Sequence, residues 1–375
     1  MTRTLIASSA DDPLELLGVL RGALDRSGPA VMPVVGPVPE PARVGTVPQP
    51  VAVVIATSGS TGIPKRVALG CDALLAAAGA SATMLGGQGQ WLLALPAHYV
   101  AGLQVLVRSI AAETVPVVLP PGRFDPVAFI EASRRMRGER HYTSLVPAQL
   151  ARLLETRAGV SALRRFDGIL VGGQATPPAL RDRVELLGLS VFRTYGSSET
   201  AGGCVYNGIP LPGVSVRIEG GQVEISGPML AEGYLGDEPL TGASFVVDDG
   251  QRWYRTGDTG EVVDGVLAVT GRADNVIVSG GVNVSLDRVE QVVRGLPGMS
   301  EAVVVGTPDE RWGEVPVVVV AGPPTRLGPV AQAVADALGK PARPARVISV
   351  ETLPVLASGK PDRVAITALA ASAPD

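Results

Sequence analysis

The chain has 375 residues, which is enough for two or three domains of ordinary size. Its 32 basic and 36 acidic residues give a formal net charge of -4, and no basic block is present that could neutralise a nucleic-acid backbone. Hydrophobic residues make up 46% of the chain, yet apolar runs such as 315–321 are far shorter than the ~20 residues of a membrane-spanning helix. We therefore expect no nucleic-acid partner and no membrane span.

The cysteines and the N-terminal residues bear on the cellular compartment. Only Cys71 and Cys204 are present, with two histidines, which fits a reducing cytosol and makes a zinc site built by the protein improbable. Asp11 and Asp12 soon follow a short apolar patch, and no basic region precedes a long apolar one. We therefore expect no signal peptide and a cytoplasmic protein.

The first half of the chain shows a pattern of alternating strands and helices. A helix is predicted over 11–26 from a capping aspartate, Pro13 and leucines at helical spacing, and 27–50 is expected to be a proline-rich connection. The further predicted strands lie near 51–56, 91–95, 115–119, 141–145, 168–172 and 190–194, and the helices near 72–85, 126–137, 147–157 and 178–188. This alternation predicts an α/β fold with a mainly parallel, helix-covered sheet.

The second half has two different patterns. Short strands over 214–218, 222–226 and 261–270, separated by glycine turns, predict a small antiparallel β region at about 205–271. After residue 274 the pattern predicts a separate α+β domain. Its elements are a first strand, a helix at 286–295, strands at 302–305 and 315–321, a helix at 329–338, a strand at 346–350 and a helix from about 361. We expect an N-terminal domain of residues 1–273 and a smaller C-terminal domain of residues 274–375.

A loop rich in glycine and hydroxyl groups, residues 57–65, follows the buried run 51–56. Its two glycines allow backbone N–H groups to turn toward one anion, and its hydroxyls and terminal lysine add donors and charge. It is not a Walker loop, because the glycines are three apart and Pro64 precedes the lysine. We predict a nucleotide-phosphate site, rather than an ordinary polar turn, formed by Thr57, Ser58, Gly59, Ser60, Thr61, Gly62 and Lys65.

Further motifs follow this loop in a fixed order. They are GGQ at 172–174, YGSSET at 195–200, YRTGD at 254–258, GRAD at 271–274 and SGKPDR at 358–363. Each is weak alone, but together they resemble the acyl-adenylate-forming superfamily, which includes acyl-CoA synthetases, peptide-synthetase adenylation domains and luciferases. The resemblance covers about 50–364. It implies an AMP-forming acid:CoA ligase that uses ATP, Mg²⁺ and CoA, and a C-terminal domain that moves as a lid.

The resemblance assigns roles around the nucleotide. Glu199 would hold Mg²⁺ through an oxygen, with Thr61 as a further ligand, and a solvated turn glutamate is the alternative. Asp258, placed in a Thr-Gly-Asp turn, would accept both ribose hydroxyls, and a turn-stabilising contact is the alternative. Tyr195 would face the adenine, although an aromatic at a strand end is more often core. The remaining nucleotide contacts implied are Gly173, Gln174, Gly196, Ser197, Thr200 and Arg272.

Lys360 is the lysine that the resemblance places on the reacting α-phosphate. Negative charge grows there as a carboxylate attacks and pyrophosphate leaves, so a lysine would stabilise the transition state more than the ground state. An exposed lysine before Pro361 is the alternative. Asp274 matches the hinge of the lid. Gly280 and Gly281 would line the pantetheine path, and Trp312 resembles a CoA-contacting tryptophan, with a core or surface tryptophan as the alternative.

The acid substrate is indicated by fewer residues. His98 could shape the acyl pocket, and Arg108, in an otherwise apolar helix, would anchor a second carboxylate unless it snorkels to solvent. Gly172 and Ser198 would also contact the acid. The segment 95–102 and the short N-terminal region resemble the o-succinylbenzoate-CoA ligases of actinobacterial menaquinone synthesis. Other aryl or acyl acids, a carrier-protein acceptor and a non-catalytic nucleotide sensor stay open, as does a homodimer.

Overall fold

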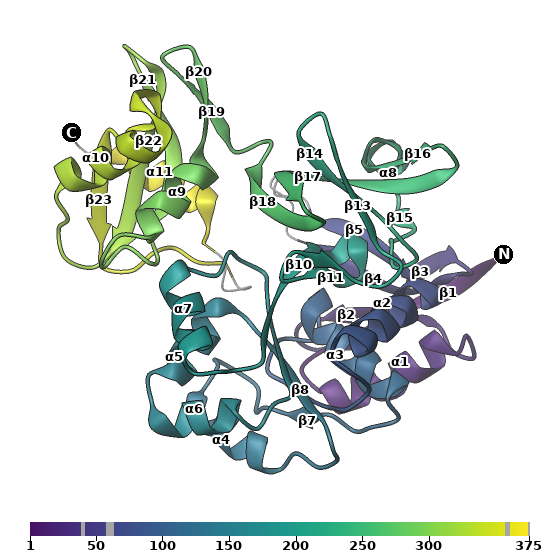
Figure 1. Ribbon diagram of the computed structural model, residues 1–375. Helices are drawn as coiled ribbons and strands as arrows, with labels where there is room; N and C mark the ends of the chain where they lie inside the picture. Colours follow the sequence, from purple (N-terminus) through teal and green to yellow (C-terminus); the bar gives the residue numbers. More distant parts are fainter. Residues whose placement is uncertain (39–41, 58–63, 357–360, 374–375) are drawn as a thin grey trace.

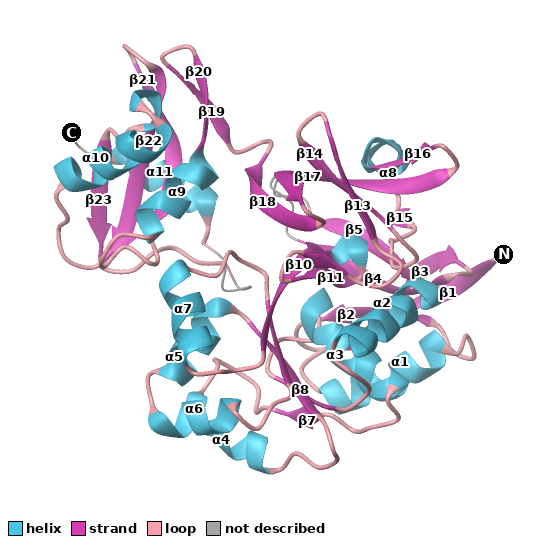
Figure 2. Cartoon of the chain, viewed as in Figure 1, coloured by secondary structure: helices cyan, strands magenta, loops and turns pink. Residues whose placement is uncertain are grey.

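The computed structural model describes residues 1–38, 42–57, 64–356 and 361–373. The fold is α/β, as expected, with a large N-terminal part and a smaller C-terminal part (Figure 1). Four sheets organise the described chain, and helices cover the two that belong to the first half (Figure 2). Within the described ranges, no helix is both long and apolar enough to cross a membrane.

The first sheet is mixed and contains strands that the sequence pattern did not reveal. Its order is β15-β5-β4-β2-β1-β3. The prediction that 27–50 is only a connection is wrong, because Val31 and Val47 are buried within strands. Pro48 lies in the edge strand β3, where a missing N–H is tolerated, so proline content misled the prediction. The strands are β1 (Thr2–Ser9), β2 (Ala30–Val34), β3 (Arg43–Pro48), β4 (Val51–Thr57), β5 (Lys65–Gly70) and β15 (Gly233–Tyr234).

The second sheet is the parallel one that the alternating pattern predicts. Its order is β12-β11-β10-β9-β8-β6-β7, and β10, β9, β8, β6 and β7 pair in parallel. The carboxyl ends of β9 and β10 lead into the motifs at 172–174 and 195–200. The strands are β6 (Gln90–Leu93), β7 (Val117–Val118), β8 (His141–Leu145), β9 (Gly168–Val171), β10 (Val191–Ser197), β11 (Gly202–Tyr206) and β12 (Ile209–Pro210).

Two groups of helices cover this sheet. Side chains of α1, α2 and α3 form the main core together with strands of both sheets, and α4 to α7 form a second core. The single helix expected at 147–157 is wrong: Thr156 caps a new helix through its hydroxyl, so the segment is divided in two. The helices of the two groups are α1 (Pro13–Leu24), α2 (Cys71–Met84), α3 (Val100–Ala111), α4 (Pro126–Arg134), α5 (Pro147–Leu154), α6 (Arg157–Leu163) and α7 (Pro178–Leu186), and a further helix, α8 (Glu238–Ser244), contacts β15 of the first sheet.

The third sheet is the expected antiparallel β region. Its order is β13-β14-β17-β16, with β18 paired to β17. The strand expected at 261–270 is instead a hairpin, because Asp264 and Gly265 adopt positive φ angles of 51° and 78° and turn the chain. The strands are β13 (Ser215–Glu219), β14 (Gln222–Ser226), β16 (Phe245–Asp248), β17 (Gln251–Val263) and β18 (Val266–Arg272).

The C-terminal part has the element order that the sequence predicts, except that the first predicted strand is a hairpin of two strands, β19 and β20. Its sheet has the order β20-β19-β22-β21, with β23 parallel to β22, and α9 and α10 share a separate apolar core with it. Arg363 at the start of α11 donates a 2.7 Å hydrogen bond to Glu290 of α9. The elements are β19 (Val276–Ser279), β20 (Val282–Ser285), α9 (Leu286–Arg294), β21 (Val303–Asp309), β22 (Gly313–Ala321), α10 (Leu327–Leu338), β23 (Arg346–Val350) and α11 (Arg363–Ser372).

Candidate active site

A tight turn at the end of β10 holds the central acidic residue of the site. Gly196 approaches β11 so closely that a side chain there would stand 2.1 Å from the carbonyl oxygen of Gly202. The backbone N–H of Ser197 donates to the Thr200 hydroxyl at 2.9 Å, and this hydroxyl donates to Gly202 at 2.7 Å. These bonds fix the short helix η1 (Ser198–Thr200), which carries Glu199.

Glu199 is buried, with 8% of its surface exposed. The hydroxyl of Tyr234 donates a 2.9 Å hydrogen bond to its Oε1 atom, so the alternative of a solvated turn glutamate is wrong. Burial, together with the charge of Glu199, raises the pKa of Tyr234, which therefore acts as a donor at neutral pH. The Nζ atom of Lys65 lies 5.5 Å from the centre of the Tyr234 ring. Pairing of β15 with β5 thus brings Lys65, the last residue of the predicted phosphate loop, beside the acidic residue.

The environment of Glu199 fits a magnesium ion bound mostly by other ligands. No group of three or more His, Cys, Asp or Glu side chains that could hold a metal is present among the described residues. Mg²⁺ is commonly held by one or two carboxylates together with water and substrate phosphates. A single oriented carboxylate beside a phosphate loop is compatible with that mode of binding.

Tyr195 and Asp258 join the second sheet to the third. The Tyr195 hydroxyl donates to Asp258 Oδ2 at 2.6 Å. Asp258 lies within strand β17 and not in a turn, because Gly257, at a φ of 72°, falls in an irregularity where the pairing of β17 with β14 shifts register. Burial raises the pKa of Asp258, against the opposing effect of Tyr195 and Arg272. Its carboxylate contacts side chains from other strands, which differs from the local turn contact considered as the alternative.

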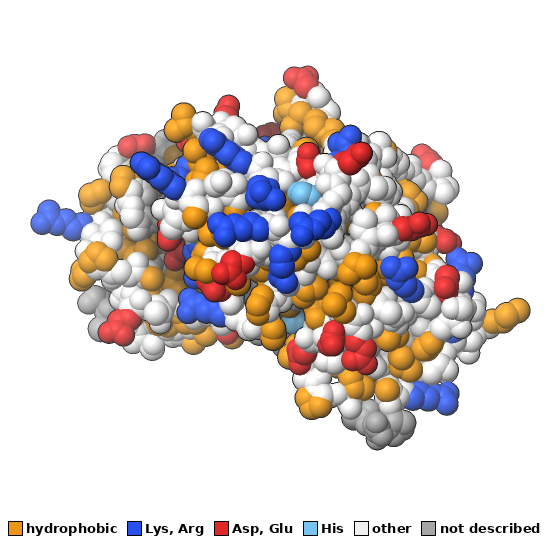
Figure 3. All heavy atoms as spheres, turned by 90° about the horizontal axis from the view of Figure 1, so that it is seen from below, with side chains coloured by type: hydrophobic (Ala, Val, Ile, Leu, Met, Phe, Trp, Pro, Cys, Tyr) orange, Lys and Arg blue, Asp and Glu red, His pale blue; other side chains and the backbone are white. Residues whose placement is uncertain are grey.

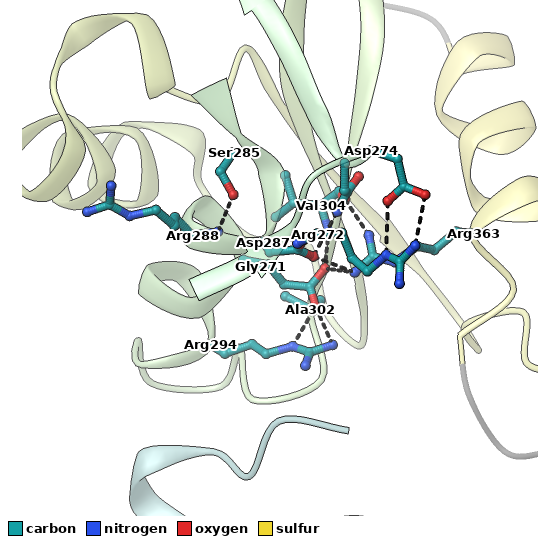
Figure 4. Close-up of polar contacts among 12 residues, drawn as sticks. Gly271, Arg272, Asp274, Ser285, Asp287, Arg288, Arg294, Ala302, Val304 and Arg363 are labelled. Carbon is teal, nitrogen blue, oxygen red and sulfur yellow. Dashed lines mark hydrogen bonds and ion pairs between the residues drawn. The ribbon is translucent and has the colours of Figure 1, made fainter. Parts of the chain in front are cut away.

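Arg272 connects this carboxylate to the segment between the two parts of the chain. Its Nη1 atom lies 3.3 Å from Asp258, and its Nε and Nη2 atoms donate to both oxygens of Asp274 at 2.9 and 3.0 Å. Figure 4 shows this pairing and the backbone N–H of Arg272, which donates to Asp287 of α9 at 2.7 Å. The hydrogen bonds from Arg272 lower the pKa of Asp274. Asp258, the predicted ribose contact, and Asp274, the predicted hinge, are therefore both bound by the guanidinium of Arg272.

The glycines after β9 lie against β10. A side chain at Gly172 would stand 2.2 Å from the hydroxyl of Thr194, and Gly173 has a φ of 82°. Both positions therefore require glycine, and they place the 172–174 loop beside the strand that carries Tyr195. Gln174 follows in the same loop and interacts with other residues of the chain.

Two of the predicted acid-binding residues, His98 and Arg108, lie just before α3 and in its last turn. His98 is half-buried, with its ring centre 4.0 Å from that of Tyr99, and burial lowers its pKa. Arg108 is only 4% exposed, so the snorkelling alternative is wrong. Its guanidinium stacks 4.8 Å from the centre of the Trp91 ring, and its Nη2 atom lies 3.4 Å from the Tyr206 hydroxyl. No described carboxylate pairs with Arg108, and burial lowers its pKa.

The three predicted CoA contacts meet at one hairpin of the C-terminal part. Gly280 and Gly281 form the turn between β19 and β20, with φ angles of 58° and 80°. Trp312 lies over this turn, since a side chain at Gly280 would stand 2.5 Å from its ring, and Trp312 is 40% exposed. It is therefore a surface tryptophan held by the hairpin, not a core residue.

Some predicted residues lie elsewhere or outside the described ranges. Ser198 starts η1 next to Glu199, and Thr57 ends β4, where its hydroxyl lies 3.4 Å from the carbonyl oxygen of Lys65. The positions outside the described residues are Ser58, Gly59, Ser60, Thr61, Gly62 and Lys360. Sequence reasoning missed Tyr234. No spacing rule marks Tyr234, because it reaches Glu199 only through strand pairing.

Comparison with known families agrees with this architecture. Residues 7–235 match the AMP-binding enzyme family, and residues 288–360 match the AMP-binding enzyme C-terminal domain. The chain therefore belongs to the AMP-binding enzyme family. It is 42% identical over 325 residues to a probable 2-succinylbenzoate–CoA ligase of Mycobacterium tuberculosis, with 84% of each chain covered. It is 31% identical to the 2-succinylbenzoate–CoA ligase of Lactococcus lactis, covering 83% of this chain and 69% of that one.

Solved structures show the same fold. The o-succinylbenzoate CoA synthetase of Bacillus subtilis in complex with the acyl-adenylate intermediate is 28% identical, with a TM-score of 0.74 over 90% of this chain and 74% of that one. A further structure of this synthetase contains ATP and a magnesium ion. The amide bond synthetase McbA of Marinactinospora thermotolerans is also 28% identical, with a TM-score of 0.77 over 98% of this chain and 80% of that one.

Proposed function

We propose that this protein is an AMP-forming ligase that activates o-succinylbenzoate with ATP and transfers the acyl group to CoA, as in menaquinone synthesis. Membership of the AMP-binding enzyme family supports the chemistry, and the relatives named 2-succinylbenzoate–CoA ligase support the substrate. The small-molecule partners are thus the acid, ATP and CoA.

The observation that best supports o-succinylbenzoate as the substrate is the environment of Arg108. A guanidinium stays charged in a protein, and burying it without a carboxylate is costly. Among the described residues, the guanidinium of Arg108 makes one aromatic contact, with Trp91, and one hydrogen bond, to the Tyr206 hydroxyl. o-Succinylbenzoate carries two carboxylates, one of which reacts while the other needs recognition. The second carboxylate would supply the missing anion, because carboxylates pair well with the planar guanidinium.

In the first half-reaction the acid carboxylate attacks the α-phosphorus of ATP, and pyrophosphate leaves. The loop at 57–65 would bind the departing phosphates, and Asp258 would accept the ribose hydroxyls. Glu199, oriented by Tyr234, would hold Mg²⁺, which neutralises phosphate charge. Lys360 would stabilise the growing charge on the α-phosphate. No general base is required, because the nucleophile is already ionised.

In the second half-reaction the CoA thiol attacks the acyl-adenylate and releases AMP. We place the boundary between the two domains at residues 273 and 274, with Asp274 as hinge, so that the C-terminal domain can present either Lys360 or the Gly280-Gly281 turn. Trp312 beside that turn would contact CoA. Rotation of this domain would then separate the two half-reactions in time.

ATP–pyrophosphate exchange over a panel of acids tests the first half-reaction. We expect exchange with o-succinylbenzoate and much less with a monocarboxylate that lacks the ring carboxylate. Arg108→Ala should lower kcat/KM for o-succinylbenzoate by roughly 100-fold, since a charged hydrogen-bonded pair is worth about 3 kcal/mol. The monocarboxylate should be nearly unaffected. Arg134→Ala, at the exposed end of α4, is the matched control.

The acyl acceptor is tested separately, because the similar amide bond synthetase is named for a different product. Acyl-adenylate made in the exchange assay is offered CoA, an amine or a carrier-protein thiol. Thioester formation with CoA supports the proposal. Exchange only with an amino acid or with salicylate would contradict the proposed acid, and a complete absence of exchange would favour a nucleotide sensor.

A further inference from the structure

An apolar helix carries two buried polar side chains on one face. Leu103, Val105 and Leu106 of α3 belong to the main core, yet Gln104 and Arg108 are only 1% and 4% exposed. Residues four apart on a helix lie above one another on the same face. The amide of Gln104 and the guanidinium of Arg108 therefore lie on the same side of α3.

Gln104 has no polar partner within the described ranges. Both its Nε2 and its Oε1 atoms are buried without a hydrogen bond, and the Nε atom of Arg108 is unpaired as well. Buried polar atoms of native proteins are nearly always paired, because leaving them unpaired forfeits their hydration. An amide oxygen accepts from a guanidinium N–H, so Gln104 Oε1 and Arg108 Nε are complementary to each other, and the remaining unpaired donor, Gln104 Nε2, indicates a ligand.

The position of Gln104 shows where this ligand would run. A side chain built at Gly202 would stand 3.4 Å from the Cγ atom of Gln104, so the glutamine lies against the backbone just after the Glu199 turn. Arg108 lies one helical turn further along, where it meets Trp91 and Tyr206. An acid that extends from the Glu199 turn to Arg108 would pass Gln104.

We propose that Gln104 is a specificity-determining residue of the acid site. Its Nε2 atom donates a hydrogen bond to the substrate carboxylate that Arg108 holds, and its Oε1 atom accepts from Arg108 Nε. A carboxylate accepts several hydrogen bonds at once, so the amide adds to the guanidinium without competing with it. This inference rests on the proposed function, since it requires an acid with a second carboxylate.

Gln104→Leu tests the inference because leucine removes both polar atoms at similar size. We expect a KM for o-succinylbenzoate at least tenfold higher, with kcat within twofold. The KM of an analogue that lacks the ring carboxylate should not change. The melting temperature of the free protein should stay level or rise, since two unpaired buried atoms are removed. Gln291→Leu, an exposed glutamine of α9, is the matched control.

Gln104→Glu provides the opposite test. A carboxylate at this position would pair with Arg108 and repel the substrate, so the KM for o-succinylbenzoate should rise further than in Gln104→Leu. Equal losses for the acid and its analogue, together with a lower melting temperature, would show that Gln104 only packs. An unchanged KM in an active Gln104→Leu enzyme would overturn this inference alone. Lack of exchange by the unmutated enzyme would overturn the proposed function as well.

Discussion

The hydroxyl of Tyr195 lies 2.6 Å from the carboxylate of Asp258 and connects strand β10 to strand β17. A residue from the parallel sheet thus holds a residue of the antiparallel region in place. The predicted adenine and ribose contacts are therefore a single unit that spans two sheets, and either residue depends on the other for its position.

Binding of ATP should depend on the protonation of Asp258. Burial raises its folded pKa, so this group favours the folded state at acidic pH, and the contribution is lost as the pH rises through that pKa. Ribose binding has the opposite dependence, because it needs the carboxylate. The KM for ATP should rise as the pH falls, with a midpoint above the ordinary aspartate value of about 3.9.

Asp258→Asn should raise the KM for ATP roughly tenfold, or about 1.4 kcal/mol. It should also remove the further rise of this KM at acidic pH. A pH series of initial rates measures both effects. Asp264→Asn, in the turn between β17 and β18, is the control. If the KM for ATP of the Asp258→Asn variant still rises at acidic pH with the same midpoint, another group is responsible for the pH dependence.

The Tyr234–Glu199 hydrogen bond should affect magnesium dependence. Tyr234→Phe removes the donor but keeps the ring that packs against Phe245 in a tilted arrangement. Hydrogen bonds to charged groups contribute about 1.5–3 kcal/mol, so we expect the Mg²⁺ concentration for half-maximal exchange to rise at least fivefold. Titration with Mg²⁺ at saturating ATP measures it. A loss of kcat with unchanged Mg²⁺ dependence would argue that Tyr234 does not orient Glu199.

Lys360→Ala should separate the two half-reactions. Adenylation should fall by several orders of magnitude, because the charge on the α-phosphate loses its stabilising partner in the transition state. Thioester formation from supplied acyl-adenylate should proceed at a rate near that of the unmutated enzyme. Single-turnover assays of each half measure this, and equal losses in both halves would contradict the assignment.

The β19–β20 turn offers a matched pair of variants for the CoA step. Gly280→Ala and Gly281→Ala both force a side chain into a positive φ, but only the former meets the Trp312 ring, at 2.5 Å. We expect Gly280→Ala to raise the KM for CoA several-fold beyond the effect of Gly281→Ala, while pyrophosphate exchange is unaffected. Equal effects of the two variants would remove Trp312 from the CoA site.

The sequence predicted the parallel sheet and the C-terminal elements well, because their apolar runs and caps are local signals. It failed where strands are short or contain proline, as in 27–50, and where Asp264 and Gly265 turn a strand back on itself. Among site residues, the motif positions could be named, but their partners could not. The contacts of Glu199 with Tyr234, and of Asp258 with Tyr195, join residues 35 and 63 positions apart and exist only after strands have paired.

The contacts of Arg272 affect any experiment that separates the N-terminal part of the chain from the C-terminal part. The side chain of Arg272 contacts Asp258, while the two other carboxylates that this residue contacts, Asp274 through the side chain and Asp287 through the backbone N–H, lie beyond the proposed domain boundary. A fragment ending at residue 273 would retain the arginine but leave it with one carboxylate in place of three. We expect such a fragment to bind nucleotide more weakly than the full chain. Chimeras with related enzymes should therefore exchange the C-terminal domain together with a matched residue at position 272.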